Sequence, residues 1–146
     1  MKSYKNKFEE LKNISSSSGI YYFYNENDNI IYIGKANNLH SRTLAHFHNH
    51  SLYREMEFFV KILNSKGLSI KDKEKLPRKL LDIWDNFIER ESKHNILVID
   101  TKFNQVKRIE IEEIQKELTE SNEKEMIQKH KPIYNYESNS DEYYQF

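Results

Sequence analysis

Two short runs of aromatic and β-branched residues near the start of the chain constrain its fold more than any other feature. They cover residues 19–24 and 30–34, and the residues that join them, 25–29, are Asn, Glu and Asp only. Runs this short and this rich in Tyr, Ile and Phe are typical of strands, and the joining residues favour a turn. Because side chains alternate faces along a strand, Tyr21 and Tyr32 can point to the same place on the predicted hairpin.

Four motifs follow one another along the chain. A Gly-Ile-Tyr triplet occupies residues 19–21, and a Tyr-Ile-Gly triplet occupies residues 32–34. Residues 35–42 follow directly with a lysine, an Asn-Leu pair and an arginine. Residues 123–135 contain a glutamate, a lysine-rich turn, a proline and a Tyr-Asn pair. In their order and spacing these motifs resemble those of the GIY-YIG nuclease family.

The resemblance implies roles for individual residues. The site residues that it implies are the motif tyrosines Tyr21 and Tyr32, the motif lysine Lys35, the catalytic arginine Arg42, the metal ligand Glu123 and the last motif residue Asn135. Repair-type members of the family carry a further tyrosine one helical turn after the arginine, where this chain has His46. Residues four apart lie on one face of a helix, so His46 should point the same way as Arg42. Since histidine is the better general base near neutral pH, we predict that His46 acts with Arg42 at the scissile phosphate.

The chemistry of these residue types suits phosphodiester hydrolysis. A single carboxylate such as Glu123 is a typical protein contribution to a site for Mg²⁺ (or Mn²⁺) that keeps most of its waters. Glu120 is the alternative ligand if the helix has a different register. Arg42 provides a planar, permanently charged fork that matches phosphate oxygens. Tyr21 or Tyr32 could orient or deprotonate water, but a phenol with a pKa of about 10 needs a nearby cation, such as Lys35, to act as a base.

The pattern along the chain predicts an α+β fold, with a central three-stranded antiparallel sheet flanked by helices. The third strand is predicted at residues 96–99, and Pro132 should stop the last helix. The predicted helices are a short amphipathic helix or frayed end at 1–13, a helix at 39–47 capped by Asn37 or Asn38, helices at 52–63 and 77–91, and a helix at 111–130.

Length and composition predict one domain. At 146 residues, 37% of them hydrophobic, the chain can build one modest core. We expect a single domain over residues 1–146, with core motifs in 19–47 and 95–135, a helical insertion at about 52–91 and a polar tail at 137–146. The chain has no cysteine, which excludes a disulfide scaffold and a thiolate zinc site. No apolar stretch is long enough for a membrane span, and the N-terminus lacks a signal peptide's apolar core, so we expect a soluble, cytoplasmic protein.

The net charge does not by itself indicate a nucleic-acid enzyme. The chain has 23 basic and 23 acidic residues, and the acidic excess lies in residues 96–146. The resemblance therefore carries the functional prediction: a divalent-metal-dependent endonuclease that hydrolyses DNA phosphodiester bonds, free-standing and of the restriction, mobile-element or defence type. Double-stranded DNA is the expected substrate and partner, with RNA as the other candidate. The alternative is a catalytically inactive nucleic-acid-binding or protein-interaction domain that keeps the fold.

The predicted insertion at 52–91 has two possible roles. Its aromatic residues could simply thicken the core. Alternatively, one or more of its basic side chains could contact the backbone of the substrate, and the candidates for that role are Arg54, Lys61, Arg78 and Lys79.

Overall fold

A computed structural model describes residues 1–46, 51–93 and 106–138 of the chain. The described strands are β1 (Lys2–Lys5), β2 (Gly19–Tyr24), β3 (Ile30–Ala36) and β4 (Arg108–Glu113). The described helices are α1 (Phe8–Leu11), α2 (Leu39–Leu44), α3 (Ser51–Ser65), α4 (Arg78–Lys93), α5 (Thr119–His130) and α6 (Ile133–Ser138), with 3-10 helices η1 (Ile70–Lys75) and η3 (Lys116–Leu118). The strands form one antiparallel sheet in the order β1-β4-β2-β3. The predicted α+β class is confirmed, but the sheet has four strands where three were predicted.

The hairpin of β2 and β3 is confirmed, and its register places the two motif tyrosines together. Tyr21 pairs with Gly34 and Phe23 pairs with Tyr32, so Tyr21 and Tyr32 are diagonal neighbours on one face. The turn between the strands is held by Asn25, whose side-chain Oδ1 accepts hydrogen bonds from two main-chain N–H groups further along the turn at 2.9 and 3.0 Å. The turn predicted at residues 25–29 is thus present and is stabilised by hydrogen bonds within the turn itself.

The remaining strands differ from the prediction. The predicted strand at 96–99 lies outside the described residues. Strand β4 pairs with β2 and begins at Arg108, so the predicted helix at 111–130 is wrong over its first residues, and α5 begins only at Thr119. The reason is that side chains alternate faces along a strand: Ile109 and Ile111 are buried in the core, while Glu110 and Glu112 face the other side of the sheet, beside Tyr24 and Tyr22. Strand β1 pairs with β4 where a helix or frayed end was predicted.

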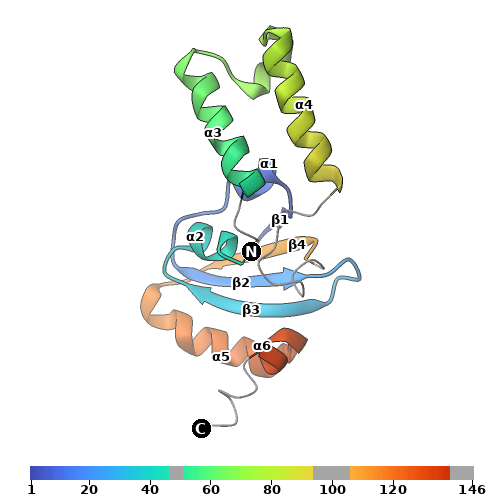
Figure 1. The fold of residues 1–146 in the computed structure, drawn as a ribbon. Helices are drawn as coiled ribbons and strands as arrows, with labels where there is room; N and C mark the ends of the chain where they lie inside the picture. Colours follow the sequence, from blue (N-terminus) through green and yellow to red (C-terminus); the bar gives the residue numbers. More distant parts are fainter. Residues whose placement is uncertain (47–50, 94–105, 139–146) are drawn as a thin grey trace.

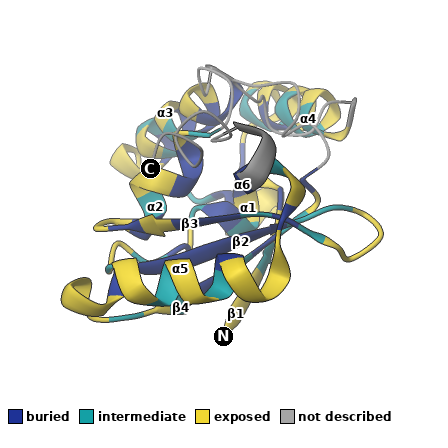
Figure 2. Ribbon diagram, turned by 90° about the horizontal axis from the view of Figure 1, so that it is seen from below, coloured by how far each residue is buried: buried dark blue, intermediate teal, exposed yellow. Residues whose placement is uncertain are grey.

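Helices cover the sheet on both faces. Helices α1, α2 and α3 lie on one side of the sheet, with the α3–α4 pair extending beyond them, and α5 lies on the other, while α6 lies beside β3 (Figure 1). The second face has a small core in which Ile20, Tyr22 and Ile33 pack with Ile127 of α5. The outer side of α5 is exposed, as Figure 2 shows. No helix in the described ranges is long and apolar enough to cross a membrane.

The two helices predicted between residues 52 and 91 are both present as α3 and α4. Trp84 of α4 is 1% exposed and stacks on Phe59 of α3, with ring centroids 6.2 Å apart. Trp84 also meets Phe8 of α1 at 6.0 Å, and a carboxylate oxygen of Glu91 accepts a 2.7 Å hydrogen bond from the main-chain N–H of Phe8. The inner face of this helical pair is therefore part of the core.

Candidate active site

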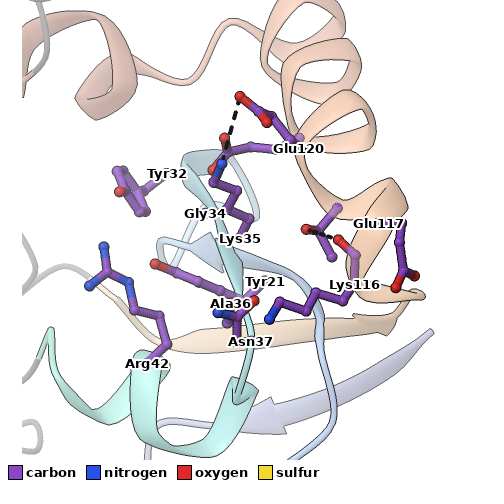
Figure 3. Close-up of a pocket in the computed structure, with 12 residues that line it drawn as sticks. Tyr21, Tyr32, Gly34, Lys35, Ala36, Asn37, Arg42, Lys116, Glu117 and Glu120 are labelled. Atoms are coloured by element: carbon purple, nitrogen blue, oxygen red, sulfur yellow. Dashed lines mark hydrogen bonds and ion pairs between the residues drawn. The ribbon is translucent and has the colours of Figure 1, made fainter.

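One cleft of about 810 Å³ lies where strand β3, helix α2 and the start of α5 meet (Figure 3). Its lining contains five of the residues predicted for the site: Tyr21, Tyr32, Lys35, Arg42 and Glu123. The rest of the lining is Gly34, Ala36, Asn37, Lys116, Glu117, Thr119 and Glu120. Strand pairing and the packing of α5 against β3 thus bring the two ends of the motif series together.

The two motif glycines are required by close contacts across the sheet. A Cβ atom on Gly34 would lie 2.1 Å from Cζ and 2.2 Å from Oη of Tyr21 on the neighbouring strand. A Cβ atom on Gly19 would lie 2.1 Å from the main-chain oxygen of Glu112. Both distances are far below van der Waals contact, so only glycine fits. Gly34 is therefore what allows the ring of Tyr21 to lie across β3 beside the cleft.

Tyr21 is fully buried except where its hydroxyl reaches the site. Burial raises the pKa of this phenol strongly, and the neighbouring Tyr32 raises it further, while the Arg42 guanidinium acts in the opposite direction. The hydroxyl lies 2.6 Å from Nε2 of His46. A phenol with a raised pKa keeps its proton at neutral pH, so the Tyr21 hydroxyl can donate to Nε2 of His46 in the tautomer that leaves this nitrogen unprotonated.

Tyr32 and His46 form an aromatic cluster with Tyr21. The ring of Tyr32 is 6.1 Å from that of Tyr21 and 5.2 Å from the imidazole of His46, and the ring of Phe23 lies 5.8 Å from that of Tyr32. His46 follows α2, which ends at Leu44 and not at the predicted residue 47. His46 does not line the cleft itself; it contacts the site through the Tyr21 hydroxyl.

Arg42 reaches the cleft from helix α2. Of the two asparagines predicted to cap this helix, Asn38 does so, and its Oδ1 accepts a 3.0 Å hydrogen bond from the main-chain N–H of Ser41. The guanidinium of Arg42 points toward the hydroxyl of Tyr21 and the ring of Tyr32 (Figure 3). The side chain is exposed, so its charge is available to an anion entering the cleft.

Glu123 enters the cleft from the second turn of α5. Its carboxylate accepts a hydrogen bond from the main chain of Lys35, and the side chain is half-buried. Burial raises the pKa of Glu123; the charge of Glu120 adds to this, whereas the charges of Lys35 and Arg42 oppose it. Glu120, one turn earlier, lies on the exposed rim and forms a 3.9 Å ion pair with Lys35. Both candidate carboxylates therefore lie in the cleft, with Glu123 the deeper one.

The cleft suits a hard divalent cation of the kind that keeps its water shell. Within the described parts of the chain no cluster of three or more His, Cys, Asp or Glu side chains forms a closed metal cage. Mg²⁺ does not need one, since it is commonly held by one or two carboxylates together with waters and substrate phosphate oxygens. The half-buried carboxylate of Glu123, beside the exposed Glu120, meets this requirement.

The family model that matches the chain is described as the UvrC-like GIY-YIG domain, and it covers residues 17–76. Over these residues the chain is similar to UvrC-like GIY-YIG domains, which supports its membership of the GIY-YIG nuclease superfamily. The matched residues include both triplets and Arg42, whereas Glu123 lies beyond them.

Relatives support the same membership. The UvrABC system protein C of Neisseria meningitidis is 34% identical over 93 residues, which cover 63% of this chain and 15% of the relative. The corresponding protein of Pasteurella multocida is 30% identical over the same length with the same coverage. That of Helicobacter pylori strain J99 is 51% identical over 37 residues, covering 25% of this chain and 6% of the relative. The aligned part thus spans about 15% or less of the length of these relatives.

Asn135, the last residue of the GIY-YIG motif series, lies outside the cleft lining. It is 2% exposed, and its side-chain amide bonds both main-chain groups of Ile33: Oδ1 accepts from the N–H at 2.8 Å, and Nδ2 donates to the carbonyl at 2.8 Å. Strand β3 is an edge strand, and Asn135 occupies the place of a partner strand along this edge. Its contacts indicate that it positions the strand that carries Tyr32 and Lys35.

Lys116 is a cleft residue of this GIY-YIG domain that sequence reasoning missed. It lies in η3, ahead of α5, and its side chain extends across the cleft toward Asn37 (Figure 3). Its neighbours Glu117 and Thr119 also line the cleft. The segment was predicted to be helical and contains no motif, so no local signal marked these residues.

Proposed function

We propose that this GIY-YIG domain is a divalent-metal-dependent endonuclease that hydrolyses phosphodiester bonds in DNA. The observation that carries the proposal is the convergence of Tyr21, Tyr32, Lys35, Arg42 and Glu123 on one cleft, although Glu123 is far from the others in the sequence. This set combines cations for a phosphate, a carboxylate for a metal and hydroxyl groups for a water molecule. Membership of the nuclease superfamily supports the same reaction class.

The cations of the cleft would bind the scissile phosphate. Arg42 offers two-point contacts to phosphate oxygens, and Lys35 and Lys116, which line the same cleft, add positive charge. Glu123 would hold the Mg²⁺ or Mn²⁺, which supplies Lewis-acid stabilisation of the developing charge when bound. The ion pair between Lys35 and Glu120 is exposed, so an incoming phosphate can replace it with little loss.

Activation of water would use Tyr21 and His46 together. Burial raises the pKa of the Tyr21 phenol, which favours its neutral form in the resting site. With Nε2 of His46 as acceptor at 2.6 Å, the phenol can pass its proton to His46 while its oxygen takes one from the attacking water. In this scheme Tyr21 is the relay and His46 is the final proton acceptor.

We further propose a free-standing nuclease of the restriction, mobile-element or defence type that acts on duplex DNA in the cytoplasm. RNA remains the second substrate to test.

The function is tested by incubating the purified chain with supercoiled plasmid, linear duplex, branched DNA and single-stranded RNA, each with Mg²⁺ or with chelator. We expect metal-dependent cleavage of duplex DNA by the parent and none by Glu123→Gln. Binding to DNA without cleavage of any substrate, across Mg²⁺ and Mn²⁺, would favour the inactive binding domain instead.

A further inference from the structure

The connection between α3 and α4 carries a dense group of basic side chains. Between residues 66 and 79 there are six basic residues and two acidic ones. The six, which we call the basic tip, are Lys66, Lys71, Lys73, Lys75, Arg78 and Lys79, and all are exposed. Because the whole chain has 23 residues of each sign, the remainder carries an acidic excess. The basic tip is therefore a strongly positive surface on a chain whose net charge is zero.

The basic tip is an ordered surface. Ile70, the first residue of η1, and Leu76, which directly follows η1, are 6% and 8% exposed, and both belong to the main core. Ser69 caps η1, with its Oγ accepting a 3.2 Å hydrogen bond from the main-chain N–H of Lys71. Because Ile70 and Leu76 are buried, the lysines of η1 lie on the exposed side of an ordered turn.

The basic side chains at the start of α4 lie in an unfavourable electrostatic environment, and a bound anion would stabilise them. Helix α4 is sixteen residues long and begins at Arg78, with no acidic residue in its first turn. Helix N-termini carry partial positive charge and favour anions, so Arg78 and Lys79 stand at the end of the helix where cations are least favourable. The ion pair of Arg78 with Asp82, at 3.5 Å and well exposed, offsets this only weakly.

The position of the tip suits a long polyanion that also enters the cleft. Helix α3 starts a few residues after α2, which carries Arg42, and runs away from the sheet, so the tip is the part farthest from it (Figure 1). Fifteen helical residues span about 22 Å. At 3.4 Å per base pair this corresponds to about six base pairs of duplex.

We propose that the basic tip binds the phosphate backbone of double-stranded DNA about six base pairs from the bond in the cleft, which makes it a second contact surface for the substrate. This inference rests on the proposed function for the identity of the polyanion. It explains how a chain of zero net charge can bind DNA: six of its 23 basic residues are concentrated on one short segment, where the duplex would run.

The test measures DNA affinity against salt concentration by fluorescence anisotropy, in chelator so that no cutting occurs. The variant replaces Lys71, Lys73 and Lys75 by Gln, and the matched control replaces three exposed lysines elsewhere, Lys2, Lys129 and Lys131, by Gln. On a 30-base-pair duplex the tip variant should bind more weakly, and the slope of log affinity against log salt should become shallower by about 2 to 3, since each lost phosphate contact contributes about 0.9.

The outcomes separate the inference from the proposed function. Equal losses of DNA affinity in the tip and control variants would show that only the net charge matters and would overturn the inference. An unchanged salt slope for the tip variant on the 30-base-pair duplex would also overturn it. If the parent cleaves DNA and the tip variant binds as well as the parent, the nuclease function is retained and the DNA contact at the basic tip is refuted. If binding depends on the tip but the parent cleaves no substrate, the DNA contact is retained and the nuclease function is refuted. Circular dichroism and the Tm of each variant establish that it is folded.

Discussion

Replacing Gly34 by alanine would create a steric clash between the new methyl group and the ring of Tyr21. The new Cβ would lie 2.1 Å from Cζ, whereas carbon atoms in contact need about 3.5 Å, so the ring must move by about 1.4 Å. Tyr21 is 0% exposed, and its ring is packed against the rings of Phe23, Tyr32 and His46, which would have to shift with it. Overpacking of this kind costs about 1–3 kcal/mol. For a chain of this size, we expect the Tm to fall by about 3–10 °C.

The same displacement should impair cleavage. Movement of the Tyr21 ring takes its hydroxyl out of the 2.6 Å contact with His46. A misplacement of about 1 Å in a catalytic group can reduce the rate about 100-fold, and we expect Gly34→Ala to do so. Single-turnover cleavage of a duplex measures this without interference from product release.

A double-mutant cycle identifies the cause. Thermal unfolding is compared for the parent, Gly34→Ala, Tyr21→Leu and the double variant, in which the added methyl group occupies space that the ring has left. The alanine should then cost at least about 1 kcal/mol less than in the parent background. Gly19→Ala is the matched control, because its obstacle is the main-chain oxygen of Glu112 and Tyr21→Leu should not rescue it. Full stability and activity of Gly34→Ala, or an equal cost in both backgrounds, would refute the steric reasoning.

Four further predictions concern single side chains of the site. Glu123→Gln should lower single-turnover cleavage by orders of magnitude and leave duplex affinity intact. Burial raises the pKa of Glu123, so the parent loses stability as the pH rises through that pKa. The variant should therefore have the higher Tm at neutral pH, and the difference in Tm should close on acidification. His46→Ala should slow cleavage and flatten its pH profile near neutrality, and an unchanged profile with full activity would reduce it to a packing residue. Lys116→Ala should raise KM and make the salt dependence of binding shallower by about 1, whereas Lys124→Ala, outside the cleft lining, should not; equal effects would remove Lys116 from the substrate contacts. Asn135→Ala leaves two buried main-chain groups without partners and should cost about 2 kcal/mol or more in urea unfolding, and a loss below about 0.5 kcal/mol would contradict its role at the strand edge.

Local patterns were sufficient for the elements whose signals lie within a few residues. The hairpin, the asparagine cap of α2 and the two helices of the insertion follow from turn chemistry, capping and helical periodicity. Strand β4 was missed because its alternation of isoleucine and glutamate is only six residues long and runs into a helix-favouring segment. Which state such a segment adopts depends on the strand beside it, and that strand lies far away in the chain.

The sequence by itself determined the residue types of the candidate site. The two triplets, Arg42, and the choice between Glu123 and Glu120 all follow from the motifs and their spacing along the chain. Only the tertiary structure decided how these residues meet: the pairing of β2 with β3 sets Tyr21 against Gly34, and α5 brings Glu123 to the main chain of Lys35. It also assigned Asn135 to the edge of β3 and brought Lys116 into the cleft. These relations depend on side-chain packing and hydrogen bonds between segments far apart in the chain, which local sequence patterns do not encode.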